Sequence, residues 1–179
     1  MYDLRAASII LVCSVAFVAL TGCLTNTEYS AVSKPNTTES ASAPAVSAGA
    51  SAIEDSTLVL INTQRTKKGL APLPMRSDLL KLARAHSQDM ATRDFHAHTN
   101  PDGESPWDRM REAGITYSSS AENIAWNNHA DQAAVAVDNW MESWGHRENI
   151  LNGDFTHTGI GVAMDSSGGA YFTQVFIRE

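Results

Sequence analysis

The period of the hydrophobic residues changes along the chain, and this change limits the fold more than any other feature. Up to Trp144, apolar residues recur every three to four positions, the spacing of amphipathic helices. From Ile160 the period becomes two, and after a Ser-Ser-Gly-Gly sequence a second run, residues 171–177, is rich in aromatic and branched residues. Two such runs joined by a turn are typical of an antiparallel hairpin. Helices followed by a small antiparallel sheet predict an α+β fold with helices and sheet in layers.

Periodicity and capping residues predict four helices before the hairpin. Pro106 and Gly114 are typical of the start and the end of the third helix. The fourth carries a bulky apolar stripe, so Trp140 and Trp144 are expected in the core, and a sharp turn is expected at Gly145. The predicted helices are residues 57–68, 77–93 with Ser77 or Asp78 as the cap, 105–114 and 131–144, and the predicted strands are residues 160–164 and 171–177.

The first residues of the chain have the pattern of an export signal. Arg5 precedes an uncharged apolar run, residues 6–20, whose length suits a signal-peptide core better than a membrane span. The run ends in Leu20-Thr21-Gly22-Cys23, which resembles the bacterial lipobox, where the cysteine is lipidated and becomes the new N-terminus. We therefore predict a lipoprotein signal peptide over residues 1–22 and lipidation of Cys23. The alternative is an uncleaved anchor helix.

The segment between the predicted lipid anchor and the first helix is poor in core-forming residues. Of residues 24–52, 20 of 29 are Ala, Ser, Thr, Pro or Gly, so residues 23–52 are predicted to be a disordered linker and residues 53–179 the folded domain. The only cysteines are Cys13 and Cys23, which leaves the mature domain without a disulfide. A formal net charge of -7 makes nucleic acid a poor partner.

Four short motifs in the domain carry the polar residues that point to a site. The motifs are Phe95-His96-Ala97-His98-Thr99, Ala121-Glu122-Asn123-Ile124-Ala125, Trp140-Met141-Glu142-Ser143-Trp144-Gly145-His146-Arg147-Glu148-Asn149-Ile150-Leu151 and Thr158-Gly159-Ile160-Gly161-Val162. Together they resemble the CAP superfamily, which comprises cysteine-rich secretory, antigen 5 and pathogenesis-related proteins, in its bacterial SCP-like branch. The resemblance extends over almost all of residues 57–176.

The resemblance implies an α-β-α sandwich around a three- or four-stranded antiparallel sheet, with an open cavity lined by two histidines and two glutamates. Matched by motif, His98, Glu122 and His146 are three members of this set. The position of the fourth is occupied by Ser143, and Glu142 beside it lies opposite the apolar stripe of its helix. This chain is therefore expected to carry a His-Glu-His triad.

The chemistry of this triad leaves two interpretations open. Two imidazoles and a carboxylate suit Zn2+ or a similar divalent cation, with His98 and His146 as the candidate ligands. The same groups could instead form a hydrogen-bonded polar cluster in which Glu122 sets the tautomer of a histidine. The remaining histidines are expected outside the site: His86 in the core, and His96, His129 and His157 at the surface. Structural roles are expected for Asn123, which would tie down its loop, and for Arg147 and Asn149. Burial is expected for Trp126, Trp140 and Trp144, with the shaping of a ligand groove as the alternative.

These observations favour an exported, lipid-anchored binding module on the outer side of the cell envelope membrane. Its cavity is expected to bind a small or lipidic ligand, with a divalent cation such as Zn2+ as the candidate cofactor. The alternative is a metal-assisted envelope hydrolase in which Glu122 is the candidate catalytic base. A third interpretation, a structural adhesin, makes the cavity irrelevant. The sequence contains no Gly-x-Ser-x-Gly elbow, no phosphate-binding glycine loop and no mature cysteine nucleophile.

Overall fold

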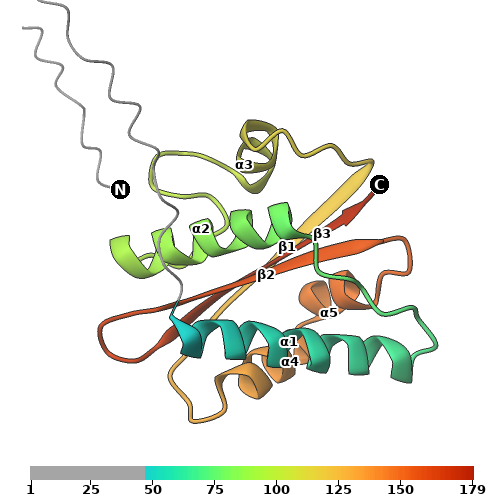
Figure 1. Ribbon diagram of the computed structural model, residues 1–179, viewed down its shortest axis with the longest axis horizontal. Helices are drawn as coiled ribbons and strands as arrows, with labels where there is room; N and C mark the ends of the chain where they lie inside the picture. The colour runs from blue at the N-terminus through green and yellow to red at the C-terminus, as the bar shows by residue number, and fades with distance from the viewer. Residues whose placement is uncertain (1–46) are drawn as a thin grey trace, which may run out of the picture. The chain divides into compact units, whose positions relative to one another are not determined.

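The computed structural model describes residues 47–179, which form three layers (Figure 1). The middle layer is an antiparallel sheet. Helices α2 and α3 cover one of its faces, and α1, α4 and α5 cover the other. The elements are α1 (Ala48–Lys67), α2 (Ser77–Arg93), α3 (Pro106–Glu112), β1 (Ser119–Asn127), α4 (Gln132–Glu142), α5 (Trp144–Leu151), β2 (His157–Met164) and β3 (Ala170–Arg178). The predicted α+β sandwich is confirmed. The predicted signal peptide, Cys23 and most of the linker lie outside the described residues.

The sheet has the strand order β1-β3-β2, so the last strand of the chain lies in the centre. The predicted hairpin is confirmed as β2 and β3, with Gly159 opposite Val175. Strand β1, which pairs Glu122 with Val175 and Asn123 with Gln174, was not predicted. Its seven-residue stretch from Ala121 to Asn127 is mostly buried, and a continuous buried run gives no alternating pattern by which a strand could be recognised.

Helix α1 begins at Ala48, nine residues before the predicted start at Thr57. Ser47 caps it, because the Ser47 hydroxyl accepts a hydrogen bond from the backbone N–H of Ala50 at 3.2 Å. Residues 48–52 of the predicted linker are therefore helical, and Ala50 is buried. Composition alone misplaced this boundary, since alanine and serine occur in linkers and in helix starts alike.

The break between the last two helices lies two residues before the predicted turn at Gly145. Ser143 is extended and separates α4 from α5, and Gly145 is inside α5. The predicted helix 131–144 therefore ends at Glu142, and the helical spacing that grouped Trp144 with Trp140 does not continue across the break. Trp140 is buried and donates a hydrogen bond to the carbonyl oxygen of Ile124 at 2.9 Å. Trp144 is 68% exposed, which corrects its assignment to the core.

Two glycines of β2 allow α2 to lie directly on the sheet. A Cβ atom at Gly159 would collide with the backbone of Leu79, and one at Gly161 would collide with the backbone of Arg84. The motif Thr158-Gly159-Ile160-Gly161-Val162 therefore sets the distance between two layers. The N-cap of α2 is Arg76, one residue before the predicted cap, and the predicted end at Arg93 is confirmed.

Within residues 47–179, no helix is both long and apolar enough to cross a membrane.

Candidate functional site

The carboxylate of Glu122 is the centre of a buried polar cluster on the side of β1 that faces α3. Its Oε1 lies 2.9 Å from Nδ1 of His98, and its Oε2 accepts a hydrogen bond from Nη2 of Arg109 at 2.9 Å. The Glu122 side chain is 3% exposed and that of Arg109 8%, while the His98 side chain is 48% exposed. A buried carboxylate needs a partner of opposite charge, and Arg109 provides it.

Arg109 also fixes the loop that carries His98. Its Nη1 donates to the carbonyl oxygen of His98 at 3.0 Å and to that of Glu104 at 3.1 Å. Helix α3 presents Arg109 inward because Pro106, Arg109 and Met110 share its buried face. The N-terminus of α3 is held by a capping box between Ser105 and Asp108, and these hydrogen bonds from Ser105 lower the pKa of Asp108 to about 2.

Arg109 is the functional residue that sequence analysis missed. Its signal was present, since Arg109 follows Pro106 by three positions and precedes Met110, so that all three fall on the apolar face of the short predicted helix. An arginine on such a face requires a buried anionic partner, and Glu122 is the carboxylate that meets it.

His146 belongs to the opposite layer. Consecutive residues of a strand point to opposite faces, so Glu122 faces α3 while Asn123 faces α5. The Asn123 amide donates to the carbonyl oxygen of His146 at 3.2 Å, and Asn149 donates to the Asn123 side-chain oxygen at 2.8 Å. Burial lowers the pKa of His146, and the nearby His98 and His96 lower it further. The site thus wraps around the free edge of β1, with His98 on one side and His146 on the other.

The structural roles predicted for Asn123, Arg147 and Asn149 agree with these contacts. Asn123 and Asn149 join β1 to α5 through the hydrogen bonds described above. Asn123 does so from a strand, and not from the expected loop. Arg147 donates to the carbonyl oxygen of Met141 at 3.0 Å and ties α5 to the end of α4.

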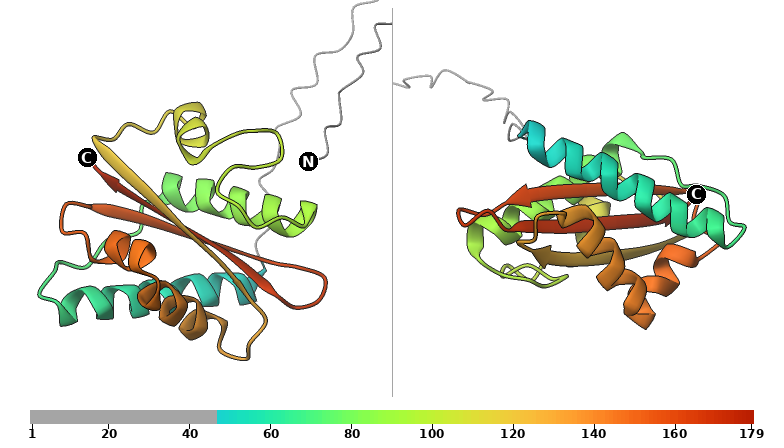
Figure 2. Two further views of the ribbon diagram at one scale, coloured as in Figure 1. Left: turned by 180° about the vertical axis from the view of Figure 1, so that it is seen from behind. Right: turned by 90° about the horizontal axis from the view of Figure 1, so that it is seen from below.

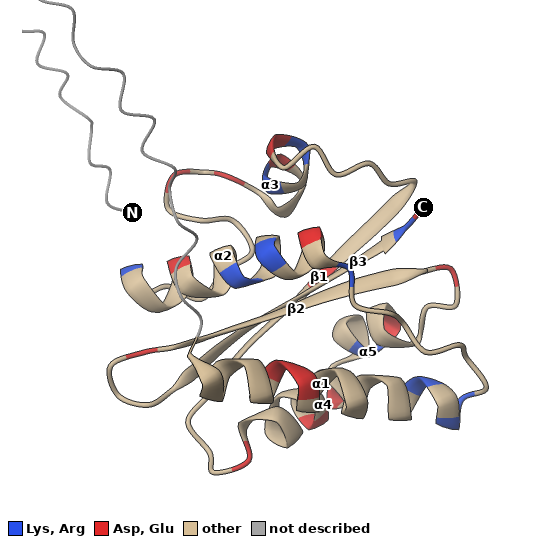
Figure 3. Ribbon diagram, in the orientation of Figure 1, with Lys and Arg blue, Asp and Glu red and all other residues tan. Residues whose placement is uncertain are grey.

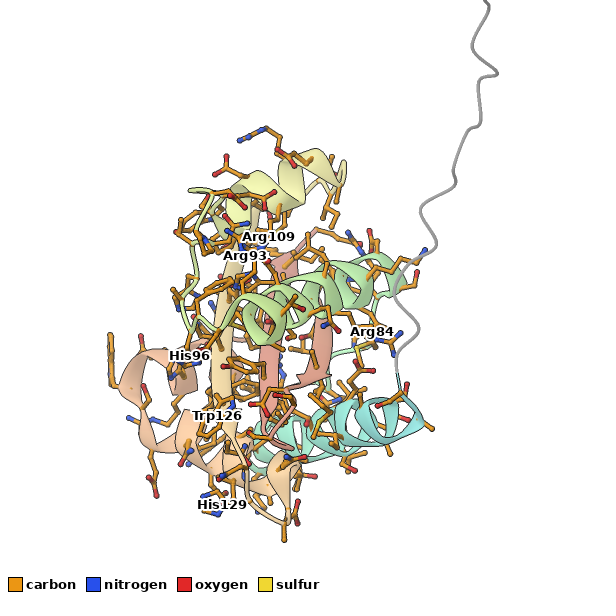
Figure 4. All side chains as sticks on the ribbon, turned by 90° about the vertical axis from the view of Figure 1, so that its left-hand side faces the viewer. Arg84, Arg93, His96, Arg109, Trp126 and His129 are labelled. Carbon is orange, nitrogen blue, oxygen red and sulfur yellow. The ribbon has the colours of Figure 1, made fainter. Side chains whose placement is uncertain are left out.

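Three of the other four histidines lie where the sequence placed them. His86 is buried, and its Nε2 lies 3.0 Å from the carbonyl oxygen of Ala97; burial, and then Arg109, lower its pKa. His96 is exposed at the rim, with its ring centroid 6.4 Å from that of Tyr171 (Figure 4). His129 is exposed, and His157 is half-buried as the first residue of β2.

Two of the three tryptophans expected to be buried are exposed. Trp126 is 41% exposed near the end of β1, where its Nε1 donates to Asp165 at 3.0 Å (Figure 4). Trp144 is exposed for the reason given above, and only Trp140 fills the core. A fourth tryptophan, Trp107 of α3, is 58% exposed and stands beside the Glu122 cluster.

A cavity of about 320 Å³ opens next to this cluster. Most of its lining is apolar, and the polar groups of His98 and Glu122 lie on one side. Apolar walls with a few fixed polar groups are typical of small-molecule sites. The lining residues are His98, Pro106, Trp107, Met110, Ser120, Ala121 and Glu122.

The sequence profile of the cysteine-rich secretory protein family, CAP, matches residues 58–176. That range contains every residue of the site. The chain belongs to the CAP family. The chain is 41% identical over 146 residues to YkwD of Bacillus subtilis, an uncharacterised protein, and 38% identical over 126 residues to YlbC, an uncharacterised membrane protein of the same organism. These matches cover 82% and 70% of this chain, but 53% of YkwD and 34% of YlbC.

Solved CAP structures share the architecture. An extracellular protein of Bacillus anthracis with an SCP domain is 29% identical, with a TM-score of 0.64 over 72% of this chain and 41% of its own. A cysteine-rich secretory protein of Staphylococcus aureus is 25% identical, with a TM-score of 0.60 over 74% of this chain and 40% of its own. The chain spans about half or less of the length of these relatives, whose similarity supports the CAP fold.

The structure shows which of the predicted site residues are in contact. His98 and Glu122 are in contact, and Glu142 is exposed at the end of α4, as the sequence indicated. Among residues 47–179, no three His, Cys, Asp or Glu side chains are arranged to hold a metal ion. Both oxygens of Glu122 are already engaged by Arg109 and His98, so Glu122 does not fit as a third metal ligand.

Proposed function

We propose that this chain is an exported, lipid-anchored CAP protein whose cavity binds the apolar part of a small or lipidic ligand. One observation supports this above all: a mainly apolar cavity of about 320 Å³ ends at a polar cluster that needs no further partner for its own charge. Because Arg109 neutralises Glu122, the cavity can accept an uncharged ligand without leaving a buried charge unpaired.

His98 gives the cavity its hydrogen-bonding group. The Glu122 carboxylate can only accept a hydrogen bond at Oε1, so Nδ1 of His98 carries the proton, and in the neutral ring Nε2 keeps a lone pair. That lone pair accepts a hydrogen bond from a hydroxyl or an amide of the ligand. Glu122 therefore acts by fixing the orientation of His98. The ion pair with Arg109 disfavours Glu122 as the proton acceptor that the hydrolase hypothesis requires, because protonation of Glu122 would break that pair.

Titration with dodecanol tests the cavity. The probe is an apolar chain with one hydroxyl, and the protein is the full-length chain with Cys23→Ser, which carries no acyl group at that position. Trp107→Ala removes a wall of the cavity and should weaken binding by about tenfold or more, the loss expected for an aromatic contact worth roughly 1.5 kcal/mol. Trp144→Ala is the matched control, since Trp144 is also exposed but does not line the cavity. Equal losses in both variants, or no binding by the unsubstituted chain, would reject the proposal.

Anchoring is proposed from Cys23 and the sequence before it, which lie outside the described residues. Mass spectrometry of protein extracted from membranes should find Cys23 at the N-terminus and acylated. Cys23→Ser should release the protein from the membrane fraction, since stable attachment needs two acyl signals. A retained residue 1–22 leader with an unmodified cysteine would favour the anchor helix instead.

A divalent cation remains a separate proposal, which the function above does not require. His98 and His146 would be its protein ligands, with Glu122 orienting His98 as carboxylates often do for metal-bound histidines. Calorimetric titration with Zn2+ should show that His98→Ala and His146→Ala each weaken binding, while His129→Ala, at an exposed histidine outside the site, does not. Zn2+ binding that is absent, or that both variants retain, would leave the cluster purely polar.

The electrostatics agree with an uncharged ligand and not with nucleic acid. Figure 3 shows acidic and basic segments interspersed along α2 and α3, and α3 is the helix that lines the cavity. The formal net charge of the chain is -7. A phosphate backbone would need a continuous basic surface, and the charges near the cavity are already paired in ion pairs such as Arg109 with Glu122.

A further inference from the structure

The two edge strands of the sheet, β1 and β2, differ in whether their outward backbone groups have hydrogen-bond partners. On the outer edge of β2, every second backbone N–H group points away from β3. Three of these N–H groups donate hydrogen bonds to groups outside the sheet. Thr158 donates to the carbonyl oxygen of Pro74 at 3.1 Å, Ile160 to the sulfur of Met75 at 3.3 Å and Val162 to Glu54 Oε1 at 3.1 Å. Such hydrogen bonds prevent another strand from pairing there.

The register shows which groups of β1 point outward. The backbone N–H groups of Thr158, Ile160 and Val162 point away from β3. The backbone groups of the residues between them, Gly159 and Gly161, therefore form the hydrogen bonds with Val175 and Thr173 of β3. The alternate residues of β3 then pair with β1, Gln174 with Asn123 and Phe176 with Ala121. The backbone groups of Ser120, Glu122 and Ile124 therefore face away from the sheet. The hydrogen bond from Trp140 to the carbonyl oxygen of Ile124 confirms this assignment independently.

This outward edge is open. Apart from that bond at Ile124, no hydrogen bond within residues 47–179 engages the outward N–H or C=O groups of Ser120, Glu122 and Ile124. Seen from behind, β1 crosses in front of the other strands, with α3 above it and α5 below, and neither helix runs across it (Figure 2). The bond from Trp140 marks the end of the open stretch, which runs from Ser120 to the N–H of Ile124.

The edge is also recessed. Glu122 is 9% exposed as a residue but only 3% in its side chain, so the part that remains accessible is backbone. Ile124 is 7% exposed. Within the described residues, the groups left without a partner on this edge are backbone N–H and C=O groups, so the partner that matches them is the backbone of an extended polypeptide chain. The side chains of two neighbouring residues in such a chain would point in opposite directions. One would face α5, and the other would enter the apolar cavity beside α3.

From this geometry we infer that the edge of β1 between Ser120 and Ile124 binds an extended segment of another polypeptide by strand addition, with one apolar side chain in the cavity. The backbone hydrogen bonds would supply affinity and the cavity would supply specificity, as in other cases of strand addition. This inference goes beyond the proposed binding of a small ligand, because the outward backbone groups of the edge add hydrogen bonds to the cavity that Ser120 and Glu122 help to line.

The test uses the full-length protein in nanodiscs and the blocked peptide acetyl-Val-Thr-Leu-Thr-Val-amide. Nuclear magnetic resonance follows exchange of the backbone amides of Ser120 and Glu122, with Ala121 and Asn123, which pair with β3, as controls in the same strand. The peptide should slow exchange at Ser120 and Glu122 by about tenfold or more at saturation, because an amide exchanges only when its hydrogen bond opens, and it should leave the controls unchanged.

Two changes separate backbone pairing from burial of a side chain. In an extended peptide, the N–H groups of alternate residues point toward the same edge of the peptide. N-methylation of both threonines therefore removes hydrogen-bond donors from one edge, and N-methylation of the leucine removes a donor from the other edge. One of these peptides should lose about tenfold or more in affinity, and the other should bind almost as the parent does. In the protein, Ser120→Pro removes an outward N–H at an edge where proline is tolerated, and Ser120→Ala keeps it. Ser120→Pro should abolish peptide binding, and Ser120→Ala should bind the peptide normally. Because Ser120 also lines the cavity, unchanged exchange at the amides of Ala121 and Asn123, which pair with β3, is the control that the strand stays folded in Ser120→Pro.

Four results would overturn the inference. The first is equal binding of both N-methylated peptides, which would mean that only the cavity is used. The second is peptide binding that survives Ser120→Pro. The third is slow exchange at Ser120 and Glu122 that rises with protein concentration without peptide, which would mean that a second copy occupies the edge. The fourth is no binding of the peptide at millimolar concentration. Loss of dodecanol binding alone would reject the proposed cavity function and leave strand addition standing.

Discussion

The ion pair between Arg109 and Glu122 should be the most sensitive interaction of the site. Arg109→Met keeps the apolar stem of the side chain but leaves the Glu122 carboxylate, 3% exposed, without its cation. Removal of one partner of a buried pair costs about 3 to 5 kcal/mol. It also removes the hydrogen bonds to the carbonyl oxygens of His98 and Glu104. For a domain of this size, the midpoint of thermal unfolding should fall by roughly 10 to 20 °C.

A double-mutant cycle distinguishes the ion pair from simple loss of packing. Arg109→Met combined with Glu122→Gln removes both charges, so the double variant should recover about half or more of the loss caused by Arg109→Met alone. The matched control is Arg111→Met on the same helix. Arg111 is 69% exposed, so solvent screens its pair with Asp108 and its replacement should change stability little. Calorimetric unfolding of the four proteins is the measurement. If Arg109→Met costs no more than Arg111→Met, or if the double variant is as unstable as Arg109→Met, the buried-pair argument is wrong.

Three further predictions concern stability. A chain that begins at Ile53 should unfold about 5 °C below one that begins at Ser47, because it lacks the Ser47 cap, the buried Ala50 and the contact of Ser51 with Arg84; equal midpoints would show that the first turn of α1 contributes nothing. Gly161→Ala should cost about 1 to 3 kcal/mol in chemical denaturation because α2 must move away, whereas Gly145→Ala, with open space around the new methyl group, should be neutral or stabilising. The lowered pKa of His86 means that below about pH 6.5 the unfolded chain binds a proton that the folded chain resists, so stability should fall with pH in that range; His86→Gln should flatten the pH dependence measured by urea unfolding, and an unchanged slope would contradict this account.

The order and the type of most elements followed from local patterns. In α2 the apolar residues recur at helical spacing, and in the β2-β3 hairpin they recur at strand spacing, with a glycine-rich turn between the strands. The short helix α3 is marked by Pro106 at its start and Gly114 just after its end. These signals depend on neighbouring residues alone, so they can be read without the fold. The exposed positions of His96 and His129 followed in the same way, because each lies outside a periodic apolar stripe.

Strand β1 and the start of α1 depended on distant parts of the chain. The stretch from Glu122 to Ala125 is buried on both faces because helices pack on each side, with Ile124 against α2 and Ala125 against α4, and that removes the alternation by which strands are recognised. The first turn of α1 has a linker composition, yet Glu54 beyond it forms a buried ion pair with Arg84 of α2 and caps the backbone of Val162. Such contacts stabilise a helix whose own residues give a weak signal.

The sequence by itself determined which residues could form a site, and the tertiary structure decided how they interact. His98, Glu122 and His146 were identified from motifs, as residues of three separate segments. That Glu122 pairs with Arg109, and is not available as a metal ligand, depended on the direction of α3. That His98 and His146 approach from opposite layers depended on β1 lying at an edge of the sheet. Both facts result from packing between segments far apart in the chain, because a charge that is buried must find its partner wherever the fold provides one.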